Sequence, residues 1–202
     1  MKEISAVQGS NIVVRTSTPT VVNSNSQDIN FDGNNKVATD TKNMEALLNK
    51  YGLKQLAQEV EWNHLSSVEV KINSKGEETL CINSKKNFSI EIPINKDYNP
   101  QNIVIYTVEG GLFLTNLSGT LKLEDNANNY VDSVNLINCK ITVYGNDELE
   151  DTIYAHGKND ITYITNDFAD VLVTSSKEGE NPLLYPLVRN IPRGKSTFNI
   201  EG

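Results

Sequence analysis

Acidic side chains are concentrated in one part of the chain, residues 145–170. This acidic stretch contains seven Asp or Glu residues and one lysine, so its formal charge is −6, out of −8 for the whole chain. From it we select a candidate binding surface of carboxylates, one tyrosine and one histidine: Asp147, Glu148, Glu150, Asp151, Tyr154, His156, Asp160 and Asp167. The neighbouring carboxylates should favour the charged form of His156. Because clustered charge steers association without exact geometry, the sequence predicts that this surface contacts a protein partner with a basic surface.

Two other kinds of chemistry could use the same carboxylates. A calcium ion needs several carboxylate and carbonyl oxygens at about 2.4 Å. The stretch has neither the EF-hand spacing nor the tandem glycines of calcium-binding repeats, so calcium is considered but not favoured. A glycosidase needs two carboxyl groups roughly 5 to 9.5 Å apart, one of them with a raised pKa. A carbohydrate-active enzyme that uses two of these carboxylates therefore remains the alternative function.

The histidines, glycines and cysteines indicate no further site. His64 and His156 have no partner at the spacing of zinc ligands, and the Gly-Gly pair at residues 110–111 is not followed by the Lys-Ser/Thr of a phosphate-binding loop. Cys81 and Cys139 each lie in an apolar, strand-like run, which predicts buried thiols rather than a disulfide framework. The sequence therefore predicts no cofactor and no metal site.

The composition of the chain argues against two classes of partner. The chain has 18 Lys or Arg residues against 26 Asp or Glu, whereas a nucleic-acid backbone requires clustered cations. No apolar run approaches the roughly 18 residues that a membrane span needs. The first residues lack the continuous apolar stretch of a secretory signal. We therefore expect a protein that is cytoplasmic, or exported without a cleaved signal peptide.

The elements that position these residues are predicted to be mostly β-strands. From Val68 onward, apolar residues alternate with polar ones for about a hundred residues. The alternating pairs fall into two series, which begin at residues 80, 103, 121, 141 and 161 and at residues 70, 90, 112, 134, 153 and 171. A recurrence near 20 residues with two short strands per unit is typical of a parallel β-helix, or β-solenoid, whose turns stack at about 4.8 Å. We therefore expect residues 70, 90, 112, 134, 153 and 171 to stack in parallel on one face.

The competing fold is an antiparallel β-sandwich or jelly roll. It also places strands every 8 to 12 residues or so, with Gly and Asn in the turns. Its usual hairpin signals, Asn-Gly and Asp-Gly, do not occur between the paired strands. The predicted fold class is therefore mainly β, a short parallel β-helix with a small N-terminal helical cap, with the sandwich as the alternative.

One segment of the predicted coils has a recognisable character. Residues 133–144, SVNLINCKITVY, resemble a coil of the parallel β-helices of bacterial surface and secreted proteins. They are also similar to the coils of cofactor-C-like and cyclase-associated proteins, in which an Asn-Cys corner recurs. The resemblance concerns architecture alone and implies no functional residue.

The chain divides into four parts. Residues 1–40 form a polar leader that could contain strands, and residues 41–62 form a helical pair. Residues 63–176 form the β-solenoid, and residues 177–202 form an extended tail. The helices are predicted from apolar residues at 3 and 4 spacing, which should cover an open end of the β region: Met44, Leu47, Leu48, Leu53, Leu56 and Val60.

These observations favour a non-enzymatic binding or interaction protein. We expect it to be bacterial and secreted or effector-like, of the kind used in virulence, with its acidic solenoid face against a basic protein. The carbohydrate-active enzyme is one alternative. The other is a structural piece of a surface assembly that stacks through an uncapped end of the solenoid.

Overall fold

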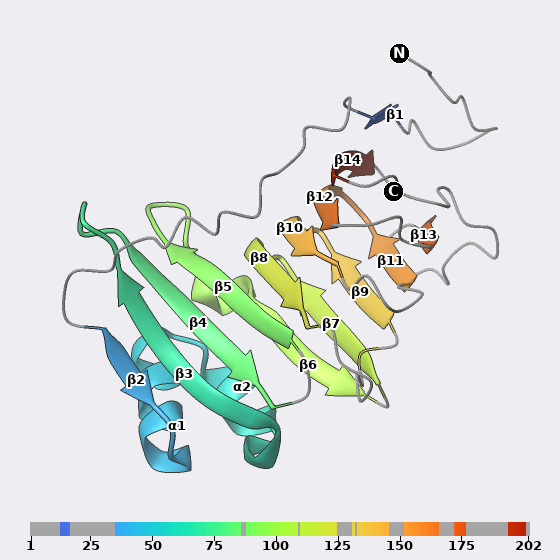
Figure 1. Ribbon diagram of the computed structural model, residues 1–202. Helices are drawn as coiled ribbons and strands as arrows, with labels where there is room; N and C mark the ends of the chain where they lie inside the picture. Colours follow the sequence, from blue (N-terminus) through green and yellow to red (C-terminus); the bar gives the residue numbers. More distant parts are fainter. Residues whose placement is uncertain are drawn as a thin grey trace.

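The computed structural model describes residues 13–16, 35–85, 88–108, 110–124, 131, 133–145, 152–165, 172–176 and 194–200 (Figure 1). These ranges contain fourteen β-strands, two α-helices and two short 3₁₀ helices, so the prediction of a mainly β fold is confirmed. In chain order, the elements are β1 (Val13–Thr16), β2 (Lys36–Ala38), α1 (Thr41–Lys50), α2 (Lys54–Glu59), η1 (Trp62–His64), β3 (Leu65–Ile72), β4 (Glu78–Ser84), β5 (Phe88–Ile94), η2 (Pro100–Asn102), β6 (Val104–Val108), β7 (Gly111–Thr115), β8 (Ser118–Leu123), β9 (Ser133–Ile137), β10 (Lys140–Tyr144), β11 (Thr152–His156), β12 (Asn159–Thr165), β13 (Leu172–Ser176) and β14 (Gly194–Ile200).

Within the described ranges, no helix combines the length and the apolar character needed to cross a bilayer.

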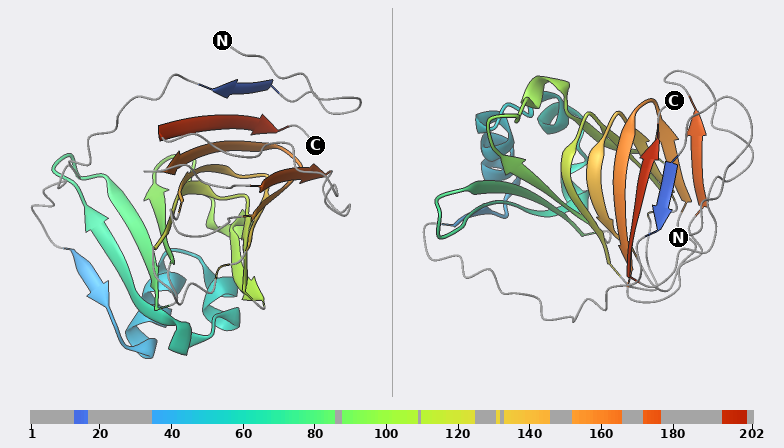
Figure 2. Two further views of the ribbon diagram at one scale, coloured as in Figure 1. Left: turned by 45° about the vertical axis from the view of Figure 1, so that its right-hand side comes forward. Right: turned by 90° about the horizontal axis from the view of Figure 1, so that it is seen from above.

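The strands form two sheets that face each other (Figure 2). The nine-stranded sheet has the order β1-β14-β12-β10-β8-β5-β4-β3-β2, and the five-stranded sheet has the order β13-β11-β9-β7-β6. Side chains alternate between the two faces of each strand. The inward-facing apolar side chains of both sheets, together with those of the helices, belong to a single hydrophobic core.

Strands β7 to β13 pass alternately between the two sheets and pair in parallel. In the five-stranded sheet, β7, β9, β11 and β13 are parallel neighbours, and in the nine-stranded sheet the same is true of β8, β10 and β12. Leu112, Val134 and Ile153 lie in register on their strands, as the 20-residue recurrence predicts. The next partner in β13 is Val173, whereas the predicted residue 171 lies outside the described residues.

The predicted parallel stack is wrong for its first two positions, residues 70 and 90. Val70 pairs with Leu80 and Ile90 pairs with Ile82, so β3, β4 and β5 form an antiparallel meander in the nine-stranded sheet. Strand β5 then pairs antiparallel with β8, so this sheet contains both parallel and antiparallel pairs. Residues 70 and 90 therefore lie on a different sheet from residues 112, 134 and 153.

The turn between β3 and β4 reverses the chain without the usual hairpin dipeptide. The side chain of Asn73 accepts hydrogen bonds from the backbone N–H groups of Lys75 and Glu77, both at 2.9 Å. Gly76 has a φ of 79°, a value that suits glycine. The sequence Asn-Ser-Lys-Gly therefore closes the β3–β4 hairpin through an asparagine side chain. It does not contain Asn-Gly, the usual signal of a hairpin turn.

The two helices lie where the two sheets diverge (Figure 2). Asp40 caps α1 by accepting a hydrogen bond from the N–H of Asn43 at 3.0 Å. Of the predicted apolar stripe, Met44, Leu47, Leu48, Leu53 and Leu56 are buried in the core, and Val60 is partly buried. Helix α1 packs on β2 and β3, and α2 packs on β6. The helices therefore fill the space between the sheets as part of the core.

Within residues 177–202, for which the sequence predicts an extended tail, the structure describes strand β14. Strand β14 pairs antiparallel with β12 and with β1. Its alternate residues Ser196, Phe198 and Ile200 are buried, so the period-2 pattern of this segment makes it a sheet strand. Residues 177–193 lie outside the described part of the chain, and the leader contributes β1 and β2.

Candidate functional site

The acidic stretch is only partly described by the structure. Asp147, Glu148, Glu150, Asp151 and Asp167 lie outside the described residues.

The three candidate residues that are described belong to two different sheets. Tyr154 and His156 lie on β11 in the five-stranded sheet, and Asp160 lies on β12 in the nine-stranded sheet, with Lys140 as one of its lateral neighbours. The structure therefore places Asp160 on a different sheet from the other two. Burial lowers the pKa of His156, which favours the neutral form, contrary to the charge expected from its acidic surroundings.

Both cysteines are buried and free, as predicted from their apolar surroundings. Burial raises the pKa of Cys81 and of Cys139 to about 11. Since the thiolate is the reactive form, neither residue is prepared to act as a nucleophile. The Asn-Cys corner at Cys139 instead has a structural role, because the Sγ of Cys139 lies 3.2 Å from the carbonyl oxygen of Leu114.

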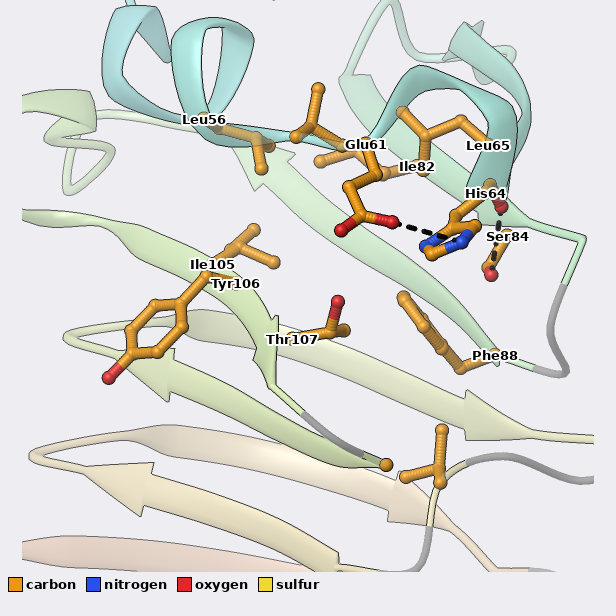
Figure 3. Close-up of a pocket in the computed structure, with 13 residues that line it drawn as sticks. Leu56, Glu61, His64, Leu65, Ile82, Ser84, Phe88, Ile105, Tyr106 and Thr107 are labelled. Carbon is orange, nitrogen blue, oxygen red and sulfur yellow. Dashed lines mark hydrogen bonds and ion pairs between the residues drawn. The ribbon is translucent and has the colours of Figure 1, made fainter.

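A pocket of about 250 Å³ lies where the sheets diverge (Figure 3). Helix α2 and η1 form one side, β4 and β5 contribute the nine-stranded sheet, and β6 forms the opposite side. Most of the side chains that line the pocket are apolar: Leu56, Val60, Leu65, Ile82, Phe88, Ile105 and Val131. Such a lining favours the apolar part of a ligand or of a partner's side chain.

The pocket lining also contains the carboxylate of Glu61 and the imidazole of His64. The Oε2 atom of Glu61 lies 3.1 Å from the Nε2 atom of His64, and the two side chains are 68% and 27% exposed. Figure 3 shows the Glu61 carboxylate between α2 and the imidazole. The pocket therefore combines an apolar lining with an accessible negative charge.

Ser84 holds the same region together. Its hydroxyl donates a hydrogen bond of 3.2 Å to the backbone carbonyl of His64, and the carbonyl of His64 also accepts from the N–H of Lys85 at 2.7 Å. These bonds connect η1 to the end of β4 and fix the position of His64. A serine that donates to a backbone carbonyl is not arranged to transfer its proton to a neighbouring base.

Strand β6 gives the pocket an exposed border. Ile105 faces the core and is buried, but Thr107, which faces the same side of the strand, is exposed because the pocket opens there. On the outer face, Tyr106 is 37% exposed and Val108 is 52% exposed. The ring of Tyr106 stacks on that of Phe113, with centroids 4.7 Å apart.

Sequence reasoning did not find this pocket. Leu56 and Val60 belong to the apolar stripe of the helical pair, and His64 has no partner at the spacing of zinc ligands. The one local signal is the spacing of Glu61 and His64, whose side chains contact each other across a single turn of 3₁₀ helix. The approach of β6 to η1 is a long-range contact, and no local pattern indicates it.

Within the described part of the chain, no group of three or more His, Cys, Asp or Glu residues could hold a metal ion.

Comparison of the chain with family models, with curated proteins and with solved structures gives no match.

Proposed function

We propose that this chain is a non-enzymatic binding protein that holds an apolar group of its ligand in the pocket between the diverging sheets. The observation that carries the proposal is the pocket itself, an opening of about 250 Å³ with a mainly apolar lining. Protein interiors are otherwise packed as densely as organic crystals. An accessible apolar pocket with a few polar groups is the usual form of a binding site.

The size and charge of the pocket narrow the class of ligand. A cavity of about 150 Å³ with an apolar lining is sufficient for benzene, so 250 Å³ accommodates one aromatic or branched group with a short extension. Glu61 is 68% exposed beside the pocket, and a cation next to the apolar group would be attracted to it. The ligand class is therefore an apolar group that carries a positive charge.

The fold suggests a scaffold for a second contact. We propose that β7 to β13 form a short β-solenoid, supported by the parallel registers of β7, β9 and β11 and of β8, β10 and β12. The acidic stretch includes β11 and β12 of this solenoid and would contact a basic protein partner, as expected from its charge of −6. Both contacts favour a partner of positive charge.

The pocket can be tested with two small probes that differ in charge. Phenethylamine and ethylbenzene are titrated into protein with labelled methyl groups, and the signals of Leu56, Ile82 and Ile105 are followed by NMR. We expect both probes to shift these signals. The amine should bind up to about fivefold more tightly, because an exposed ion pair contributes at most about 1 kcal/mol.

Two variants serve as controls for this experiment. Glu61→Gln should remove the preference for the amine, whereas Glu45→Gln, which removes an exposed carboxylate of α1 outside the pocket, should retain it. If millimolar concentrations of both probes leave the three methyl signals unchanged, the pocket is not a binding site and the proposal fails.

A further inference from the structure

We infer that the partner is a protein segment in extended conformation, which adds to the free edge of β6 and places one large apolar side chain in the pocket. This inference rests on the proposed function, because it requires the pocket to accept an apolar group. It adds the kind of partner and its mode of binding. The argument depends on the edge of β6, on the alternation of side chains along a strand and on the charge beside the pocket.

Strand β6 is the last strand of the five-stranded sheet. Among the described residues it pairs only with β7, so its other edge presents backbone N–H and C=O groups that no described strand uses. Helix α2 packs against β6, and Leu56 and Ile105 both line the pocket. The second half of the strand, Tyr106 to Val108, is exposed at all three positions.

The sequence of β6 lacks the features that normally protect an edge strand. Natural sheets protect their edges with lysine, proline, bulges or very short strands. Strand β6 reads Val-Ile-Tyr-Thr-Val, and its register with β7 has no bulge. By contrast, β2, at the end of the nine-stranded sheet, has three residues and includes Lys36. The edge of β6 is therefore suited to pairing with another strand.

The pocket lies directly beside this edge. Tyr106, Thr107 and Gly110 are part of its lining (Figure 3). In a strand added along β6, alternate side chains would point towards the core, and the one opposite Thr107 would enter the pocket. Main-chain hydrogen bonds then give affinity, and the pocket selects the inserted side chain. This is the usual division of roles when a peptide is added to a sheet edge.

The pocket favours a peptide over a second copy of this chain. If the β6 strands of two copies paired, they would offer each other Ile105 and Thr107 on the inner face, and Ile105 is already buried in its own core. A threonine would leave most of the 250 Å³ empty. The exposed carboxylate of Glu61 further favours a segment with a lysine or arginine near its apolar residue.

The experiment uses a synthetic heptapeptide, Thr-Lys-Val-Phe-Val-Lys-Thr, in which the lysines share the face of the Phe; it is blocked at both ends and labelled with fluorescein. Affinity is measured by anisotropy, and hydrogen exchange of the amides at residues 106–108 is measured with and without peptide. We expect the peptide to bind and to slow exchange at β6. Replacing its Phe by Ser should weaken binding at least about tenfold, because a buried Phe side chain contributes at least that factor. Replacing both Lys by Glu should also weaken it.

Two exposed valines provide a matched pair of protein variants. Val108→Lys places a charge on the edge of β6 and should weaken binding of the peptide. Val37→Lys makes the same change on β2, where the valine is 58% exposed, and should leave the affinity unchanged. Thr107→Phe should occupy the pocket from β6 and compete with the peptide's Phe.

Three results would overturn the inference. Those amides of residues 106–108 that point away from β7, as the N–H groups of alternate residues in an antiparallel pair do, could already be protected in the free protein, or their protection could rise with protein concentration in the absence of peptide. In the third case, the small amine probe would shift the pocket methyl signals while the peptide left exchange at β6 unchanged. That third result would retain the proposed function and reject strand addition. If neither the amine, the neutral probe nor the peptide bound in the pocket, the proposed function would fail as well.

Discussion

Asn159, the first residue of β12, is buried at the corner between β11 and β12. Its side-chain amide accepts one hydrogen bond and donates another. Its Oδ1 atom accepts a hydrogen bond of 2.9 Å from the N–H of Cys139, and its Nδ2 atom donates one of 2.9 Å to the carbonyl of His156. The side chain is 2% exposed. The backbone bond from the N–H of Asp160 to the carbonyl of Cys139, at 2.8 Å, joins the same two corners. Asn159 therefore connects the corner between β11 and β12 to the corner between β9 and β10.

Replacing this asparagine should therefore be costly. Asn159→Leu retains the approximate volume but leaves the N–H of Cys139 without its acceptor, and a buried unsatisfied donor costs about 1–3 kcal/mol. Denaturant unfolding of Asn159→Leu should show a loss in this range in the free energy of unfolding. Asn138→Gly is the control, because Asn138 has a φ of 53° that glycine accepts. The N–H of Lys158, which loses the Oδ1 of Asn138, belongs to an exposed residue that water can reach. Equal losses in the two variants would contradict this account.

For single residues, the sequence predicts which side chains are buried better than it predicts which side chains line the pocket. Cys81, Cys139, Leu112 and Val134 are buried as their alternating pattern indicates, because period 2 is a property of the strand itself. Glu61 and Thr107 give no such signal. Their proximity to the pocket depends on how β6 and η1 approach each other, which is decided by the packing of distant elements.

Among the elements, the joint between α1 and α2 holds the helical pair against the sheets. Gly52 has a φ of 77°, and a Cβ added there would lie 2.7 Å from Cγ of Pro100 in η2. The hydroxyl of Tyr98 donates to the carbonyl of Tyr51, and the hydroxyl of Tyr51 donates to Glu78 at 3.0 Å. Burial raises the pKa of both tyrosines to about 12, so both remain donors at neutral pH.

Gly52 at this joint and Gly76 in the β3–β4 turn together distinguish the cost of backbone strain from the cost of close packing. Gly76 has a φ of 79°, and a Cβ there would meet nothing within 4 Å. Gly76→Ala should therefore lower the free energy of unfolding by about 1–2 kcal/mol, which is the cost of holding alanine in the left-handed conformation. Gly52→Ala should cost about 1–3 kcal/mol more, because the new methyl group overlaps the ring of Pro100. Thermal and denaturant unfolding of the two variants give the comparison, and equal costs would show that the joint yields without strain.

The order of the strands was only partly predictable for a similar reason. Alternation identifies a strand, but it does not decide whether the next strand returns as a hairpin or continues as a coil. Strands β10 and β12 follow Asn and Gly corners at residues 138 and 157, both with positive φ, and the chain crosses to the other sheet there. The side-chain bonds of Asn73 turn the chain back instead. The two outcomes depend on local hydrogen bonds that the apolar pattern does not contain.

In the whole molecule, the antiparallel meander, the parallel strands and the helices share one hydrophobic core. The buried cluster extends from Ala38 and Met44, at the helical end, to Phe198 and Ile200 of β14. A one-dimensional solenoid would behave differently, because each of its repeats contacts only its neighbours and the terminal repeats can open independently. The continuous core therefore predicts cooperative unfolding of the whole molecule.

The only tryptophan of the chain, Trp62, makes this prediction testable. It lies in η1, next to the helices, and its fluorescence reports on that end of the molecule. Leu48→Ala and Phe198→Ala remove side chains that are 0% and 1% exposed, at opposite ends of the core, and such truncations cost about 2–5 kcal/mol. Phe198→Ala should shift the denaturant midpoint seen by Trp62 as much as the midpoint seen by far-ultraviolet circular dichroism, and Leu48→Ala should do the same. If Phe198→Ala moved the circular dichroism midpoint and left the fluorescence midpoint in place, β14 and its neighbours would unfold as a separate unit. The core would then behave as a stack of repeats, and the pocket would belong to an independently stable half of the molecule.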